Sequence, residues 1–202
     1  MVGKIALFIV ALFFVQATTP PKVVLFFGDS LSAGYGLNPE DAFPALVEKS
    51  LVKQGVNARV VNAGLSGETT AGGLSRIDWI LRQPIDVFVL ELGGNDGLRG
   101  LPVTQTKKNL QTIIDRVKAK YPKCQIVLTG MLVPPNMGPE YAKGFQSVFR
   151  EVAASNKLVF VPFLLEGVGG IEKLNQADGI HPNAEGHKIV AGNLTKVIKP
   201  LL

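Results

Sequence analysis

Fully apolar runs alternate with amphipathic helical patterns along most of this chain. The run Val23–Phe27 is apolar at every position, which is typical of a strand in a parallel sheet covered by helices on both faces. By contrast, Leu110, Ile113, Ile114 and Val117 recur with the spacing of one helical face. The predicted strands cover residues 23–27, 58–63, 87–92, 125–131 and 158–163. The predicted helices cover residues 43–54, 70–81, 103–120, 140–155 and 184–198.

This alternation predicts one three-layer α/β/α domain built on a five-stranded parallel sheet. Right-handed crossovers would place helices on both faces of that sheet. We expect the flavodoxin-like strand order 2-1-3-4-5, which puts the first strand between the second and the third. The domain is expected to span residues 18–202, because no internal repeat, low-complexity segment or interdomain linker interrupts the pattern.

The first seventeen residues have a different pattern and are set apart from the fold. Lys4 precedes the apolar run Ile5–Val15, and small residues follow around Ala17. This combination predicts a secretory signal peptide over residues 1–17, with cleavage after Ala17. The run is shorter than the about 20 apolar residues of a membrane span, although an uncleaved anchor is the alternative. The expected location is therefore periplasmic or secreted.

Composition excludes several other classes of protein. The chain has 202 residues, of which 47% are hydrophobic and 18% charged, as in globular and not disordered proteins. The net charge of +5 comes largely from scattered lysines, which indicates a solvated basic face and no nucleic-acid partner. Transient contact with membrane lipid is left open, and a monomer or weak homo-oligomer is expected. Cys124 is the single cysteine, so no internal disulfide forms, and no Cys/His cluster has metal-ligand spacing.

Four polar, glycine-rich turns follow predicted strands or precede the last helix. They cover residues 28–31, 64–69, 93–97 and 178–182. The turn at 93–97 is expected to be a sharp one at the carboxyl end of the third strand. Because the carboxyl ends of neighbouring parallel strands meet at one edge, the first three turns should converge where open α/β sheets hold their ligands.

The residue types in these turns suggest nucleophilic catalysis. Ser30 follows the first strand, and its hydroxyl would need a base to take its proton. His181 is suited to that task, and Asp178, three residues earlier, could orient the imidazole ring. Attack on an acyl carbonyl also requires donors for an oxyanion. The backbone N–H groups of Ser30 and Gly67 and the side-chain amide of Asn95 are the candidates.

Each of these residues also has a structural interpretation. Asp178 could cap the loop before the last helix, and Asn95 and Gly67 could serve their turns through backbone conformation alone. Taken singly, all but His181 favour the structural interpretation. Taken together, in this order and each at the boundary of an element, they favour the catalytic one.

Two further polar residues are assigned structural roles. His187, the second of two histidines, is expected to be on the surface or partly buried and not catalytic. Asp29 adjoins Ser30 but is not expected to be the acid that orients His181. We expect its side chain to hold the turn through backbone hydrogen bonds.

Four sequence blocks carry a resemblance to a known family. The blocks are Gly28–Tyr35, Asn62–Thr69, Glu91–Gly100 and Asp178–Asn183. In this order they resemble the GDSL, or SGNH, hydrolases, and within that family the bacterial periplasmic branch described as arylesterase, acyl-CoA thioesterase I or lysophospholipase L1. The resemblance covers essentially all of the chain after the signal, and it maps the oxyanion glycine to Gly67 and not to Gly64. It implies a serine esterase that needs no metal or organic cofactor.

The choice of substrate is less sharply indicated. Leu98, Leu132 and Pro134 lie in short loops at the expected site, and apolar loops of this kind suit the acyl chain of an ester or thioester in an open site. The expected substrates are therefore aryl and acyl esters, acyl-CoA and lysophospholipids. A carbohydrate O-acetyl esterase on the same scaffold and a non-catalytic lipid- or glycan-binding protein are the alternatives. The absence of a Gly-x-Ser-x-Gly elbow around Ser30 argues against the α/β-hydrolase lipases.

Overall fold

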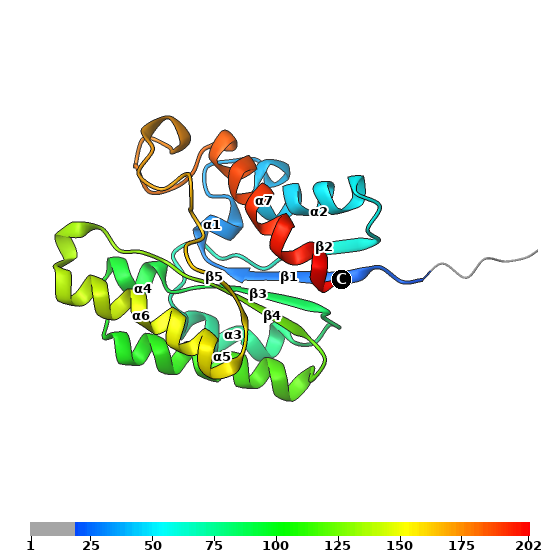
Figure 1. Cartoon of the computed structure of the whole chain (residues 1–202), viewed down its shortest axis with the longest axis horizontal. Coiled ribbons are helices and arrows are strands. Elements are labelled where there is room, and N and C mark those ends of the chain that lie inside the picture. Colours follow the sequence, from blue (N-terminus) through cyan, green and yellow to red (C-terminus); the bar gives the residue numbers. More distant parts are fainter. Residues whose placement is uncertain (1–18) are drawn as a thin grey trace, which may run out of the picture.

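A five-stranded parallel sheet forms the centre of the molecule in the computed structural model, which describes residues 19–202 (Figure 1). The strands are β1 (Lys22–Gly28), β2 (Ala58–Asn62), β3 (Val87–Glu91), β4 (Gln125–Thr129) and β5 (Val159–Val161). Their order is β2-β1-β3-β4-β5, and every pairing is parallel. The flavodoxin-like order predicted from the sequence is confirmed.

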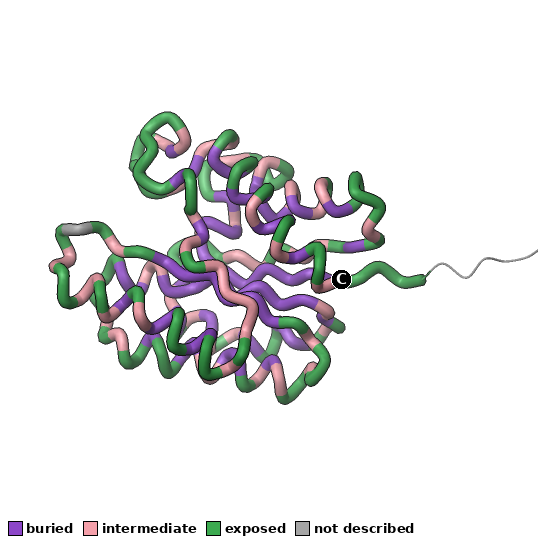
Figure 2. The backbone as a smooth tube through the Cα atoms, in the orientation of Figure 1, coloured by how far each residue is buried: buried purple, intermediate pink, exposed green. Residues whose placement is uncertain are grey.

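Helices cover both faces of this sheet. The long helices are α2 (Phe43–Lys53), α3 (Thr70–Ile80), α5 (Val103–Lys120), α6 (Pro139–Asn156) and α7 (Ala184–Ile198). In Figure 1, α2 and α7 lie together on one side of the sheet, and α3, α5 and α6 lie on the other. The central strands β1, β3 and β4 are buried on both faces (Figure 2), which explains why their sequences show no polar alternation. The edge strands β2 and β5 are only partly buried.

Aromatic side chains from the first and third strands fill much of the interior. The ring of Phe26 meets that of Phe43 edge-on, with centroids 5.5 Å apart, and Phe27 lies 5.6 Å from Phe88 on the neighbouring strand. All four side chains are almost completely buried. Burial of each contributes roughly 1.5–3 kcal/mol of hydrophobic stabilisation. The core therefore holds β1 rigidly beneath the turn that carries Ser30.

Short helices occur where the sequence predicts only turns. The expected turn at 93–97 is instead a one-turn helix, α4 (Gly94–Leu98), entered from Gly93 with a φ of 119°. Likewise α1 (Ser30–Ala33) begins at the end of β1, where the Asp29 side chain accepts a hydrogen bond from the Leu31 N–H at 3.0 Å. Helices of one turn are too short to produce a hydrophobic period. Between residues 19 and 202 there are also four 3₁₀ turns: Pro39–Asp41, Pro135–Met137, Glu172–Leu174 and Lys199–Leu201.

The loop after β2 is fixed by an ion pair. Arg76 of α3 pairs with Glu68 and also donates a hydrogen bond to the Ala63 carbonyl at 2.8 Å. The same guanidinium lies 4.3 Å from the centre of the Phe27 ring. These contacts hold residues 64–69 against the carboxyl end of the sheet, as the strand order leads one to expect.

The signal peptide predicted over residues 1–17 lies outside the described residues. Between residues 19 and 202, no helix combines the length and the apolar character that a membrane crossing requires. In Figure 1 the start of the described chain and its carboxyl terminus lie at the end of the sheet opposite to α1 and α4. The start of the described chain therefore lies far from the edge that carries the polar turns.

Candidate active site

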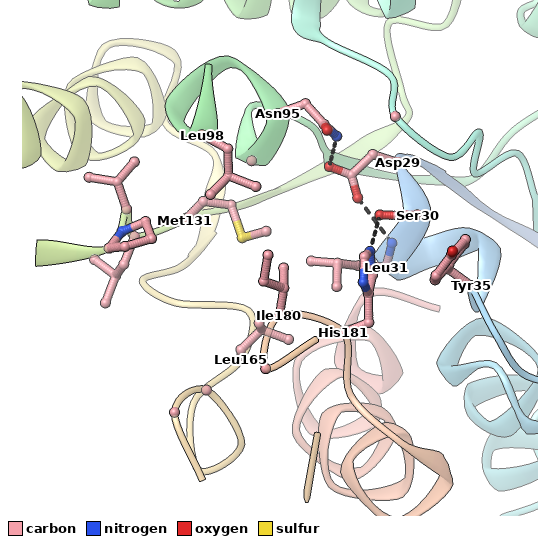
Figure 3. Close-up of a pocket in the computed structure, with 18 of the residues that line it drawn as sticks. Asp29, Ser30, Leu31, Tyr35, Asn95, Leu98, Met131, Leu165, Ile180 and His181 are labelled. Carbon is pink, nitrogen blue, oxygen red and sulfur yellow. Dashed lines mark hydrogen bonds between the residues drawn. The ribbon is translucent and has the colours of Figure 1, made fainter. Parts of the chain in front are cut away.

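Ser30, His181 and Asp178 form a continuous chain of polar contacts at the carboxyl edge of the sheet. The Ser30 Oγ lies 2.8 Å from the His181 Nε2, although 151 residues separate them in the sequence (Figure 3). On the other side of the ring, the His181 Nδ1 lies 2.8 Å from the Asp178 Oδ2. The structure thus brings together the three residues that the sequence singled out as nucleophile, base and acid.

Asp178 is held in its ionised form by a turn of its own loop. Its Oδ1 accepts hydrogen bonds from the backbone N–H groups of His181, at 3.0 Å, and of Ile180, at 2.9 Å. These two bonds, followed by the contact with the His181 ring, lower the pKa of Asp178 to about 2. A carboxylate at this position favours a proton on the Nδ1 of His181, which leaves Nε2 free to accept the proton of Ser30.

A glutamine ties the loop of His181 to the segment that follows α1. The backbone N–H of Gln176 donates to the His181 carbonyl at 2.7 Å, and its Nε2 donates to the carbonyls of Tyr35, at 2.7 Å, and Pro182, at 3.0 Å. The Tyr35 ring also packs against the His181 ring, with centroids 4.7 Å apart. Sequence reasoning missed Gln176, because its partners are distant and no local motif marks it.

The backbone N–H groups of two residues in the cavity lining have no hydrogen-bond acceptor within the described residues. Ser30 and Gly67 both line this cavity, and no group in the described residues accepts a hydrogen bond from either N–H. Gly67 has a φ of 79°, a conformation that favours glycine. Free N–H groups in the lining of one cavity are available to stabilise an oxyanion.

Asn95, the third predicted donor, is already hydrogen-bonded within the protein. Its Nδ2 donates to the Asp29 Oδ2 at 3.0 Å and to the Glu68 carbonyl at 3.1 Å. Both amide hydrogens are therefore occupied, and the side chain is fixed at the edge of the cavity. To reach an oxyanion, Asn95 has to share or redirect one of these hydrogens.

Asp29 connects the turn of Ser30 to Asn95. As the sequence indicated, it holds the turn by accepting from the Leu31 N–H, and its other oxygen binds Asn95 instead of His181. Burial raises the pKa of Asp29 to about 6, against the opposing effect of these hydrogen bonds. The sequence did not predict the contact with Asn95. Asp29 follows β1 whereas Asn95 follows β3, so the two residues are far apart in the chain.

An apolar cavity of about 530 Å³ extends from Ser30. Leu98, Leu132 and Pro134, which the sequence suggested for substrate contact, all line it. Met131 and Val133, from the same apolar loop as Leu132, also line it. Sequence reasoning did not select three further lining residues: Phe163, Leu165 and Ile180. Figure 3 shows Leu98 and Met131 on one side of this space and Ile180 and Leu165 on another. Among the described residues, no cluster of three or more His, Cys, Asp or Glu is arranged to bind a metal ion.

His187 lies away from this cavity, in the packing between α2 and α7. The expectation of a surface or partly buried position was wrong, because the residue is only 1% exposed. Its Nδ1 accepts the Phe43 N–H at 3.0 Å, and its ring stacks on the Phe43 ring with centroids 5.7 Å apart. Burial lowers the pKa of His187 to about 4, so the ring is neutral and structural. The sequence did contain a sign of this burial, because His187 has helical spacing to the buried residues Val190, Ala191 and Leu194 of α7.

Comparison with known proteins gives one consistent family. A family model described as "GDSL-like Lipase/Acylhydrolase family" matches residues 26–189. Esterase TesA of Pseudomonas aeruginosa is 43% identical over 182 residues, which is 90% of each chain. Thioesterase 1/protease 1/lysophospholipase L1 of Escherichia coli K12 is 37% identical over 197 residues, or 97% of this chain and 91% of the relative.

A solved structure with the same fold also belongs to an esterase. The psychrotrophic esterase EstA of Pseudoalteromonas sp., inhibited by monoethylphosphonate, superimposes with a TM-score of 0.83 at 32% identity. The match covers 89% of this chain and 97% of the esterase. The likeness therefore extends over most of the chain.

Proposed function

The chain belongs to the GDSL-like lipase/acylhydrolase family, and from this premise we propose that Ser30, His181 and Asp178 are its catalytic triad. The protein is a GDSL-type serine hydrolase with esterase activity. The observation that carries the assignment of residues is the contact of 2.8 Å between the Ser30 Oγ and the His181 Nε2, backed by an ionised Asp178.

The proposed reaction proceeds through an acyl-enzyme. His181 takes the proton of Ser30 as the Oγ attacks the carbonyl carbon of the substrate, and the carbonyl oxygen becomes an oxyanion. The N–H groups of Ser30 and Gly67 and the amide of Asn95 would hold that oxyanion. When the tetrahedral intermediate collapses, His181 returns its proton to the leaving alcohol or thiol. Water, activated by the same ring, then attacks the acyl group and releases the acid and free Ser30.

We propose that the substrates are acyl esters and thioesters with an apolar acyl chain. The cavity beside Ser30 has the size and the apolar lining of a site for such a chain. The names of the relatives, an esterase and a thioesterase/lysophospholipase, support aryl and acyl esters, acyl-CoA and lysophospholipids as the classes to examine. The O-acetyl esterase alternative is disfavoured because an acetyl group would leave most of this cavity unfilled. A non-catalytic binding protein is disfavoured by the paired Ser30, His181 and Asp178.

We also propose that the mature protein begins after Ala17 and acts in the periplasm or outside the cell. The pattern of Lys4 followed by Ile5–Val15 supports a signal peptide, and amino-terminal sequencing of the exported protein tests the cleavage site. A lysophospholipid substrate would bring the chain into transient contact with membrane lipid. The mature chain is further proposed to be a monomer or weak homo-oligomer, which analytical ultracentrifugation tests.

The decisive experiment is the variant Ser30→Ala. We expect hydrolysis of p-nitrophenyl butyrate to fall by at least roughly a thousandfold, because the nucleophile is lost. A fluorophosphonate probe should label the parent at Ser30, as peptide mass spectrometry can show, and should leave the variant unlabelled. Ser147→Ala is the matched control, since the Ser147 hydroxyl bonds the Gly144 carbonyl and the Glu151 carboxylate, both in its own helix α6.

Parent-like activity in a folded Ser30→Ala variant would refute the assignment of the nucleophile. The substrate class is tested separately on the parent with p-nitrophenyl esters from acetyl to palmitoyl, a long acyl-CoA, a lysophospholipid and an acetylated glycan. We expect activity on chains well beyond acetyl. A steep loss of rate beyond acetyl would establish the O-acetyl esterase alternative in its place.

A further inference from the structure

A second carboxyl group lies directly beneath the turn that carries Ser30. Glu91 is the last residue of β3, pairs in register with Gly28 of β1, and is completely buried. Its Oε2 accepts hydrogen bonds from the Asp29 N–H, at 3.1 Å, and from the Ser32 hydroxyl, at 2.7 Å. Asp29 and Ser32 flank Ser30, so a single carboxyl oxygen holds the chain on both sides of the nucleophile.

The glycine before Asp29 is required by this carboxyl group. A Cβ placed on Gly28 would lie 2.2 Å from the Glu91 Oε2 and 2.3 Å from the Ser32 Oγ. Gly28 is a strand residue outside the left-handed region, so lack of space, and not backbone conformation, excludes a side chain there. The lack of a side chain at Gly28 therefore leaves the space that the Glu91 carboxyl group occupies.

The surroundings of Glu91 favour an uncharged carboxyl group. In residues 19–202 no Lys, Arg or His forms an ion pair with it, and its Oε1 has no hydrogen-bond partner. The titratable group that faces it is Asp29, which in turn is influenced by His181 and Glu68. Burial, followed by repulsion from Asp29, raises the pKa of Glu91 well above its ordinary value. An unpaired charge here would cost far more than one unsatisfied hydroxyl.

We propose that Glu91 is a positioning residue, which as a neutral carboxylic acid holds Asp29 and Ser32 and thereby fixes Ser30 against His181. The proposal rests on the proposed role of Ser30 as nucleophile. A neutral acid suits this place because it accepts both hydrogen bonds through Oε2 without adding negative charge behind the site. An ionised carboxylate would oppose the negative charge that develops on the oxyanion.

The variants Glu91→Gln and Glu91→Ala separate this role from simple packing. Glutamine keeps a neutral side chain with a carbonyl oxygen, so kcat at pH 7 should stay within about threefold of the parent. Alanine leaves the Asp29 N–H and the Ser32 hydroxyl unpaired, so kcat should fall roughly 10- to 100-fold while KM changes less than about threefold. The rate of Ser30 labelling by a fluorophosphonate should fall by the same factor as kcat.

Ser32→Ala provides a milder variant in case Glu91→Ala does not fold. It removes one of the two hydrogen bonds, and kcat should fall roughly 3- to 10-fold. The matched control is Thr195→Val, which removes another buried hydroxyl, bonded to the Ala191 carbonyl of α7, and should leave kcat unchanged. A kcat for Ser32→Ala equal to that of Thr195→Val would overturn the proposal.

Infrared difference spectroscopy tests directly whether the Glu91 carboxyl group is protonated. At pH 8 the parent should show the carbonyl stretch of a protonated carboxylic acid that is absent from Glu91→Gln. Absence of this band, or a Glu91→Gln variant as impaired as Glu91→Ala, would overturn the neutral-acid role.

Failure of this inference can be told apart from failure of the proposed function. If Ser30→Ala is active, the nucleophile has been misassigned. If Ser30→Ala is inactive while Glu91→Ala keeps the parent's kcat and labelling rate, only the positioning role is refuted.

Discussion

The two carboxyl groups nearest to Ser30 and His181 are shifted in opposite directions by their surroundings. Hydrogen bonds from backbone N–H groups lower the pKa of Asp178 to about 2, so it remains an anion throughout the neutral range. Burial raises the pKa of Asp29 to about 6, so it is the more readily protonated of the two. Opposite shifts in neighbouring acids are typical of separate roles in one site. Here the proposed role of the anion is to orient His181, whereas the buried acid holds the turn and Asn95.

Asn95 shows how a proposed oxyanion donor can be held in place before substrate arrives. The variant Asn95→Ala should lower kcat roughly 100- to 1000-fold, because it removes the amide that would redirect one hydrogen to the proposed oxyanion. KM should change much less, since the oxyanion exists only in the transition state. Steady-state kinetics with p-nitrophenyl butyrate measures both quantities.

The control for this variant is Asn156→Ala. Asn156 is a half-buried amide on α6 whose Nδ2 also donates two hydrogen bonds, to Gln111 and to the Val152 carbonyl. Its loss should affect stability and leave kcat near the parent's. An Asn95→Ala variant with kcat within a few-fold of the parent would remove Asn95 from the proposed oxyanion hole.

At the scale of elements, the site depends on how the loop before α7 is fastened to the segment after α1. Gln176 makes that connection through one side-chain nitrogen bonded to the carbonyls of Tyr35 and Pro182. The loop has no regular hydrogen-bonded partner strand beyond an isolated bridge between Asn175 and Pro182. Its position, and with it that of His181, therefore rests on a few specific contacts.

Gln176→Ala should loosen this loop without unfolding the domain. We expect amide hydrogen exchange in peptides that cover residues 176–183 to become faster and kcat to fall roughly 3- to 10-fold, because two hydrogen bonds are lost. Gln111→Ala is the control, since the Gln111 Nε2 also makes two contacts, to Asp115 and Asn156, on α5 and α6. Unchanged exchange and unchanged kcat in Gln176→Ala would show that the loop is held by other contacts.

At the scale of the whole molecule, stability should depend on pH through His187. The ring is neutral in the folded protein, where burial lowers its pKa from 6.5 to about 4. The unfolded chain binds a proton below pH 6.5 and the folded chain only below about 4, so stability is lost as pH falls through this window. The loss attributable to His187 is up to about 3 kcal/mol.

Urea denaturation at pH 7 and pH 4, for the parent and for His187→Asn, measures this contribution. Asparagine can still accept the Phe43 N–H but does not titrate, so the variant should lose less stability on acidification. The raised pKa of Asp29 has the opposite effect on stability, because its folded form binds a proton more readily as pH falls. Asp29 is present in both proteins, so its contribution cancels when the parent and the variant are compared. Equal pH dependence in parent and variant would contradict the role given to His187.

The fold and the candidate residues were largely predictable because the sequence patterns that indicate them lie within short segments of the chain. Fully apolar strands, amphipathic helices and the polar turns between them are properties of short segments, and right-handed crossovers convert their order into a doubly wound sheet. Ser30, Asp178 and His181 each lie in such a turn, so the sequence alone indicated the chemistry and the edge of the sheet where it would be found. The family resemblance pointed to the same residues.

Only the tertiary structure decided which distant groups meet. The contact between Ser30 and His181, the burial of His187 and the tie made by Gln176 all depend on packing between segments far apart in the chain. In the sequence, Glu91 is one polar residue that ends an apolar strand. Its partners and the clash that makes Gly28 a glycine exist only because β1 and β3 pair in one register. Hydrophobic pattern determines which face of an element is buried, whereas strand register and side-chain contacts determine what a buried polar group can bind.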